Sequence, residues 1–171
     1  MKKEKRFIPL NIQFFARKKN ALTKYFIAEV PTGESTEPDY LRLAKWISTV
    51  EDDSDEETED TAFYDGDGTP ESDVMSVKKA YTFEGFFDAD DPAHQLIQKL
   101  EFETGEGRKI MFKQERTDGT ILEGPATVTE PKVTGGEASE YASLGCTIAW
   151  DKKPDITQGG DGGGDGGGVE G

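Results

Sequence analysis

The sequence predicts a mainly β domain of the α+β class: a β-sandwich or barrel-like fold with one flanking α-helix, a long acidic loop and flexible termini. Short runs alternate apolar and polar residues, one segment has an apolar stripe at helical spacing, and glycine-containing turns separate the runs. The 171 residues divide into a basic N-terminal arm or leader (1–24), a β domain (25–153) and a glycine-rich tail expected to be disordered (154–171).

The N-terminal arm combines positive charge with a short alternating run. It carries eight Lys and Arg side chains against the single acid Glu4, a local charge of about +7 by counting. Between Ile8 and Phe14 every second residue is apolar, which is a strand-like period, and Pro9 restricts such a strand to an edge or to an added position. Either an added strand or a removed leader fits this pattern.

An acidic segment interrupts the first part of the β domain. Residues 40–50 are rich in β-branched and aromatic side chains and predict a strand. Residues 51–73 then carry twelve Asp and Glu side chains and no Lys or Arg. Like charges at this density predict a mobile loop, and a loop this long rarely persists in a compact domain without a task. We expect that task to be contact with a neighbouring molecule.

A second strand and the one convincing helix follow the acidic segment. Residues 77–87 alternate, with Tyr81 and Phe83 on the face expected to be buried. Asp90 or Asp91 can cap a helix that begins near Pro92. Its apolar stripe is formed, at helical spacing, by Ala93, Leu96, Ile97 and Leu100.

The last third of the domain predicts a hairpin and a final strand. Residues 109–116 and 120–128 flank Thr117-Asp118-Gly119, and Asp-Gly between two strand-like runs is a strong hairpin signal. Residues 141–150 place Cys146 and its alternate neighbours on one apolar face. Pro154 is expected to end the ordered chain.

Composition excludes several classes of function. The net charge of −15 and pI near 4.5 argue against a protein that holds nucleic acid by its phosphates. The lone Cys146 excludes an intrachain disulfide, and no apolar stretch approaches the length that spans a bilayer. The N-terminus makes a poor secretory signal, so we expect a protein made in a cytoplasm and not bound to a membrane.

The sequence offers no visible active site, so we predict that the protein is not an enzyme and binds no cofactor. His94 is the only histidine and lies outside the apolar stripe, which favours a solvated helix side chain. Cys146 is expected to be a buried, inert thiol. One Cys and one His are too few for zinc, and the run from Asp65 to Gly68 fails as an EF-hand because Ser76 occupies its twelfth position. Diffuse cation binding by the acidic segment stays open.

Two aromatic residues stand out in the acidic segment. Phe63 and Tyr64 do not suit a purely solvating loop, and aromatic side chains are favoured anchors at protein interfaces. The alternative is that they pack locally against the parent domain. An interaction protein is therefore the function class that the residues favour.

The chain resembles a known family, the major tail (tail tube) proteins of long-tailed phages of Gram-positive bacteria. The resemblance covers residues 25–153, and its most specific parts are FYDGDGTPE in the acidic segment and DPAHQLI on the helix. The opening LNIQFFA is similar to a leader segment found on several structural proteins of such phages.

The resemblance implies a structural virion protein. Six copies would form a ring by joining their sheets, and rings would stack into a hollow tube that conducts DNA during ejection without binding it specifically. Implied partners are further copies of the chain, a tape-measure protein, and the tail terminator and tail-tip proteins. The implied location is the phage tail, with assembly in the bacterial cytoplasm.

The resemblance also implies which residues contact a neighbour. The acidic segment would be the stacking loop and the N-terminal arm a second contact, and we hypothesise that the two attract each other with a strength that falls as salt rises. The inter-subunit contact candidates are Phe63, Tyr64, Asp65, Asp67, Ile12, Phe14 and Phe15. The alternative function is an acidic DNA mimic that inhibits a host enzyme. A third class of function is a hydrolase, which the lone His94 disfavours.

Overall fold

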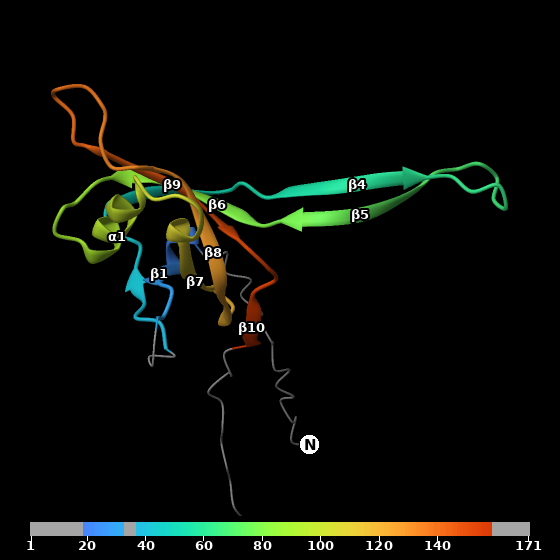
Figure 1. The fold of residues 1–171 in the computed structure, drawn as a ribbon, viewed down its shortest axis with the longest axis horizontal. Helices are drawn as coiled ribbons and strands as arrows, with labels where there is room; N and C mark the ends of the chain where they lie inside the picture. Colours follow the sequence, from blue (N-terminus) through green and yellow to red (C-terminus); the bar gives the residue numbers. More distant parts are fainter. Residues whose placement is uncertain (1–18, 33–36, 159–171) are drawn as a thin grey trace, which may run out of the picture.

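The fold is a single curled sheet with one helix packed against it and one long hairpin that projects away from it (Figure 1). This computed structural model describes residues 19–32 and 37–158. The sheet curls into a half-barrel, which confirms the predicted β-rich, barrel-like fold with a flanking helix. In the described part of the chain, no helix has the length and apolar character needed to cross a bilayer.

Within residues 19–32 and 37–158, the main sheet has eight strands, and all of its pairs are antiparallel. Their order is β2-β1-β7-β8-β9-β6-β3, and β10 pairs with the first part of β8. The bounds are β1 (Lys24–Glu29), β2 (Leu41–Arg42), β3 (Ile47–Asp52), β6 (Ala80–Phe86), β7 (Lys109–Glu115), β8 (Thr120–Lys132), β9 (Ser143–Trp150) and β10 (Asp155–Gln158). Two short 3-10 helices, η1 (Asn20–Leu22) and η2 (Gly105–Arg108), precede β1 and β7.

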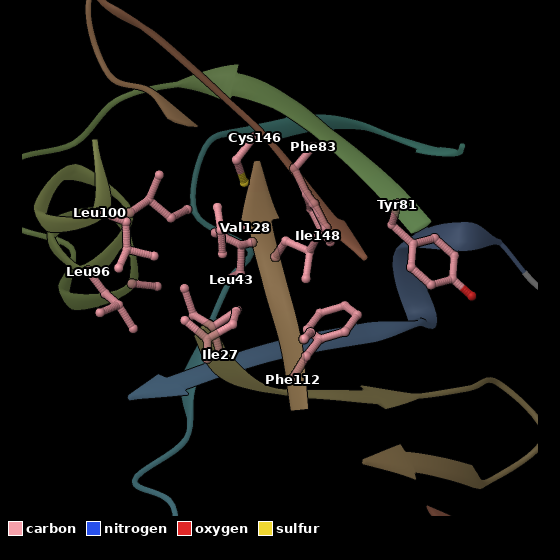
Figure 2. Close-up of a cluster of buried hydrophobic side chains, with 14 of the residues drawn as sticks. Ile27, Leu43, Tyr81, Phe83, Leu96, Leu100, Phe112, Val128, Cys146 and Ile148 are labelled. Carbon is pink, nitrogen blue, oxygen red and sulfur yellow. The ribbon is translucent and has the colours of Figure 1, made fainter. Parts of the chain in front are cut away.

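The hydrophobic core lies between the helix and one face of the sheet (Figure 2). Side chains alternate between inward and outward along β7, most of β8 and the first part of β9, and the sequence predicted this alternation for β9. Aromatic rings fill the centre, with the Phe112 and Trp150 ring centroids 4.7 Å apart and Tyr25 edge-on to Phe83 at 5.1 Å. Cys146 lies in this core.

The helix α1 (Pro92–Leu100) begins where the sequence predicted. The Asp91 carboxylate accepts hydrogen bonds from the backbone N–H groups of Ala93 (2.9 Å) and His94 (3.2 Å), so Asp91 rather than Asp90 is the cap. All four residues of the predicted stripe are buried, and Figure 2 shows Leu96 and Leu100 directed toward the sheet.

The predicted hairpin around Asp118 is confirmed. The strands β7 and β8 pair from Lys109↔Thr127 to Glu115↔Ile121, and Gly119 adopts the positive φ of 87° that the turn requires. The strand β8 continues to Lys132, beyond the predicted end at residue 128, because β9 pairs with its second half.

The predicted continuous strand over residues 40–50 is wrong. The chain forms β2 and β3 with a break between them, where Trp46 has a φ of 55°. Lys45 and Trp46 are both held by the Asp88 carboxylate, at 2.7 Å and 3.1 Å respectively. The carbonyl oxygen of Trp46 also lies over Gly85, where a Cβ atom would come within 2.2 Å of it. The backbone just before β3 thus turns tightly over Gly85 of β6, the neighbouring strand in the sheet.

The predicted structureless loop over residues 51–73 is also wrong. Residues 51 and 52 end β3, and the rest belongs to the hairpin β4 (Asp55–Thr61) and β5 (Glu71–Lys78). The hairpin continues the β3–β6 ladder without a change of register, from Asp52↔Tyr81 to Asp55↔Lys78. Backbone pairing that is already in place therefore extends into the acidic segment and outweighs its charge repulsion.

Two further strands lie outside the sequence-based prediction. The strand β1 was not predicted, although residues 25–28 are apolar, and it lies between β2 and β7. The strand β10 follows Pro154, the expected end of the ordered chain, and pairs from Asp155↔Glu123 to Gln158↔Thr120. The first part of β8 pairs with β7 on one side and is open on the other side, where β10 pairs with it. The sequence of the tail does not reveal this partner.

Candidate assembly surfaces

The β4–β5 hairpin is exposed along almost its whole length. No residue of β4 or β5 is buried, and the hairpin projects far from the half-barrel (Figure 1). Two strands without a third strand or a packed layer are marginally stable in water. Glu59 faces Asp73 directly across the ladder, which adds a like-charge repulsion. The hairpin is therefore suited to contact with something outside this fold.

The two faces of the hairpin differ in chemistry. Residues directly opposite each other project to the same face, so Val74 and Val77 share one face with their partners Thr58 and Glu56. These valines are 56% and 60% exposed. The other face carries acidic residues at most of its positions, listed by register as Asp55, Glu57, Glu59, Asp73 and Glu71. One face is thus partly apolar and the other anionic.

The hairpin tip carries the predicted contact residues Phe63, Tyr64, Asp65 and Asp67. The Phe63 side chain is 59% exposed and the Tyr64 side chain is fully exposed. Packing of these rings against the parent domain, the alternative weighed from the sequence, is therefore wrong. Asp67 shapes the turn: its carboxylate accepts a hydrogen bond from the Thr69 N–H at 2.9 Å. Hydrogen bonds from the Thr69 side chain and, to a smaller extent, its backbone lower the pKa of Asp67.

Three further predicted contact residues, Ile12, Phe14 and Phe15, fall outside the described residues. Asp65 shares the tip turn with Asp67, where the Gly66 N–H donates to the Phe63 carbonyl at 3.2 Å. The described ranges contain no group of three or more His, Cys, Asp or Glu residues arranged to hold a metal ion, the loop around Asp65 included.

A second exposed set is aromatic and lies at the opposite end of the same strands. The pairs Ile47↔Gly85 and Phe86↔Ser143 bring the start of β3, the end of β6 and the start of β9 together. The exposed aromatic side chains at this end are those of Trp46, Phe86 and Tyr141, which we call the aromatic end set. The Phe86 and Tyr141 rings contact each other at 6.0 Å. Sequence reasoning missed this set because its members are far apart in the chain.

The sheet has an open edge. Among the described strands, β3 pairs on one side with β6 and has no partner on the other. At the far end of the sheet, β2 covers β1 over only two residue pairs, Phe26↔Arg42 and Ile27↔Leu41. Unpaired backbone N–H and C=O groups at a sheet edge can bind a further strand.

The face of the sheet away from the helix carries polar and charged side chains among apolar ones. The Thr82 and Thr147 hydroxyl groups hydrogen-bond across β6 and β9 at 2.8 Å. Lys113 lies over the rings of Phe26 and Tyr40, at 4.8 Å from each, and the Tyr40 hydroxyl donates to Glu123 at 2.9 Å. Burial beside that carboxylate raises the pKa of Tyr40 well above its usual value. This face can line an aqueous space.

The two residues considered for catalysis are both buried. His94 was predicted to be solvated, and this is wrong: its side chain is fully buried, stacks on Phe87 at 6.1 Å and accepts a hydrogen bond from the Asp88 N–H at 3.0 Å. Burial lowers the pKa of His94. Burial also raises the pKa of Cys146 to about 12, in agreement with an inert thiol. Neither group can reach a substrate.

Comparison with known proteins identifies the fold. No protein-family description and no curated protein sequence matches the chain. Among solved structures, the chain is similar to one from the tail of an empty gene transfer agent particle refined with C6 symmetry, with a TM-score of 0.62 and 18% identity. The match covers 83% of this chain and 99% of the other.

A second match comes from the virion of a native gene transfer agent particle. Its TM-score is 0.58 at 15% identity, again over 83% of this chain and 99% of the other. A chain from the sheath–tube complex of an extracellular contractile injection system is more distant, with a TM-score of 0.44 and 12% identity. At these identities the two gene transfer agent matches establish a shared fold with those chains.

Proposed function

We propose that this chain is a structural, non-enzymatic subunit of a virion tail tube, of the kind the sequence resemblance implies for long-tailed phages of Gram-positive bacteria. Six copies form a ring, and rings stack into a hollow tube that conducts DNA. The observation that carries the proposal is the similarity over 99% of a chain from a tail with C6 symmetry. The projecting hairpin and the open sheet edge give this chain the surfaces that such an assembly needs.

Ring formation would use the open edge of β3. A strand from the next copy can add there, since a cyclic, heterologous contact removes exposed edges by closing on itself. The helix and core cover one face of the sheet, so the face carrying Thr82, Thr147 and Lys113 is the one available to line the channel. With a net charge of −15, such a tube would repel phosphates, and DNA would slide through it.

Stacking would use the two ends of the β3–β6–β9 strands. The hairpin tip with Phe63 and Tyr64 lies at one end, and the aromatic end set lies at the other. A subunit with different apolar surfaces at its two ends can stack head to tail without limit, which is how filaments form. We infer that the tip of one copy contacts the aromatic end set of a copy in the next ring.

Electron microscopy of concentrated protein tests the assembly. We expect hollow tubes of uniform diameter from the intact chain. Phe63→Ser with Tyr64→Ser should leave rings or monomers that stack poorly, and Phe86→Ser with Tyr141→Ser should give the same defect from the other side of the contact. Phe102→Ser is the matched control, because Phe102 is 90% exposed and belongs to neither end. Tubes of normal length from both double variants would contradict the stacking contact.

The proposed partners follow from the tube. A tape-measure protein would occupy the channel during assembly in the bacterial cytoplasm, and terminator and tip proteins would bind the two ends.

One observation favours a second candidate function, inhibition of a host enzyme by DNA mimicry. The acidic residues of β4 lie on an ordered strand and not on a flexible loop. A stable monomer that never forms tubes and inhibits a nuclease would favour this second function.

A further inference from the structure

The hairpin carries an apolar face that the described part of the chain flanks only at its base, where Val77 lines a groove with Trp150 and Pro154. Val74 and Val77 lie on that face with Thr58, and each valine is more than half exposed. Burial of two valine side chains is favourable through the hydrophobic effect, and a two-stranded ribbon on its own is only marginally stable. A third segment laid on this face would therefore both bury the valines and stabilise the hairpin.

The charge of the hairpin restricts what that segment can be. The paired strands hold seven acidic residues and one basic residue, Lys78, by counting along residues 55–61 and 71–78. Most of these carboxylates point to one face, but Glu56 and Asp60 border the valine face. A suitable segment presents apolar side chains on one side and carries positive charge at its ends.

The N-terminal arm has both properties. Ile8, Leu10, Ile12 and Phe14 recur at every second position, so an extended arm would present them on one side. Four basic residues precede this run and three follow it, listed as Lys2, Lys3, Lys5 and Arg6, then Arg17, Lys18 and Lys19. The arm thus matches the apolar face in pattern and the bordering carboxylates in charge.

The arm also enters the described structure beside the hairpin. Asn20 and Ala21 of η1 line one groove together with Val50 and Asp52 of β3. Asp52 is the last residue of β3 and is followed directly by the hairpin. The five residue steps from Lys19 back to Phe14 span at most about 17 Å, and residues 8–14 would cover roughly 23 Å, the length of a seven-residue strand such as β4.

We propose that, in the free subunit, residues 8–14 lie along the Val74–Val77 face of the hairpin of the same chain. The short connection to Lys19 gives the arm a high effective concentration at this site, so it binds within its own chain before it meets another copy. Its basic ends face Glu56 and Asp60. The consequence for assembly rests on the proposed function: a tube would form as the arm leaves this face and becomes available to the neighbouring copy.

Amide hydrogen exchange of the dilute, full-length monomer tests the contact. Leu10→Asp with Ile12→Asp places two charges on the apolar side of the arm, and we expect amides of β4 and β5 to exchange at least tenfold faster. The matched control, Asn11→Asp with Gln13→Asp, adds the same charge at the alternate positions and should change exchange by less than twofold. Equal effects from the two pairs, or no effect from either, would overturn the proposal.

Cysteine cross-linking distinguishes the same chain from a neighbour. Ile12→Cys with Val74→Cys should give an internally linked monomer on oxidation at low protein concentration, and Gln13→Cys with Val74→Cys should link far less. The native Cys146 is buried and does not compete. Linked dimers without linked monomers would overturn the proposal. Because both measurements use the free subunit, they are independent of whether the protein forms tubes.

Discussion

The curled sheet and the β4–β5 hairpin are built on the same ladder but are stabilised in opposite ways. In the sheet, β7, β8 and β9 bury every second side chain against α1 and an aromatic cluster. In the hairpin, no side chain is buried and like charges face each other. Regular backbone pairing therefore does not by itself indicate a stable unit, and the uncovered hairpin is the element that we propose for contact between copies.

Loss of a core ring should have the largest effect on stability. Phe112 is fully buried and contacts four aromatic rings. We expect Phe112→Ala to lower the free energy of unfolding by about 3–5 kcal/mol. Tyr64→Ala, at the hairpin tip, should change it by less than about 0.5 kcal/mol. Denaturant unfolding of the monomer measures both, and similar losses would mean that the tip packs on the domain.

The tight turn over Gly85 should be the next most sensitive point. A Cβ atom there would lie 2.2 Å from the Trp46 carbonyl oxygen, so Gly85→Ala must displace the backbone. We expect a loss of about 1–3 kcal/mol in the free energy of unfolding. The control is Gly145→Ala in the neighbouring strand, where the nearest atom is 3.7 Å away. A harmless Gly85→Ala would show that β3 can move away from β6.

The buried histidine should make the sheet, and not the hairpin, sensitive to mild acid. Because burial lowers the pKa of His94, the unfolded chain binds a proton more readily than the folded chain does. The stability contribution is complete above the unfolded pKa of about 6.5 and declines as pH falls below it, by at most about 1.4 kcal/mol per pH unit. Thermal unfolding at pH 7.5 and 5.5 measures the slope.

His94→Gln supplies the control for this pH dependence. The substitution removes the titrating group while keeping a side chain that can accept the hydrogen bond from the Asp88 N–H. We expect the variant to lose most of the slope between pH 7.5 and 5.5. Asp88 does not interfere in that range, because Lys45 and the Asp90 N–H hold its pKa at about 2. An unchanged slope would assign the effect to other groups.

Removal of one cross-strand repulsion should have the smallest effect. Glu59 faces Asp73, whereas Glu57 faces Ser76, whose hydroxyl donates to it at 3.3 Å. Glu59→Gln should slow amide exchange in the hairpin by a few fold, as expected from about 0.2–1 kcal/mol for a directly opposed like-charge pair. Glu57→Gln should not slow amide exchange, and neither substitution should change the free energy of global unfolding. Equal effects would show that total charge, not the cross-strand pair, limits the hairpin.

Sequence reasoning succeeded where the signal is local. The helix cap (placed at Asp90 or Asp91), the apolar stripe of α1 and the turn at Gly119 each depend on residues close together in the chain. It also found Phe63 and Tyr64 as exposed candidates, because aromatic residues are conspicuous in an acidic segment. It missed Val74 and Val77 as a shared face, because the irregular register between Glu57 and Thr58 places them three residues apart and hides the period of two.

By itself, the sequence determined the β-rich class, the helix with its apolar stripe and a cap at Asp90 or Asp91, and the inward face of β9. Only the tertiary structure decided that β1 lies between β2 and β7, that β10 pairs with β8, that His94 is buried, and that the acidic segment extends the β3–β6 ladder. The reason is physical: periodicity and capping are written within a few residues, whereas strand partners and burial depend on segments far apart in the chain.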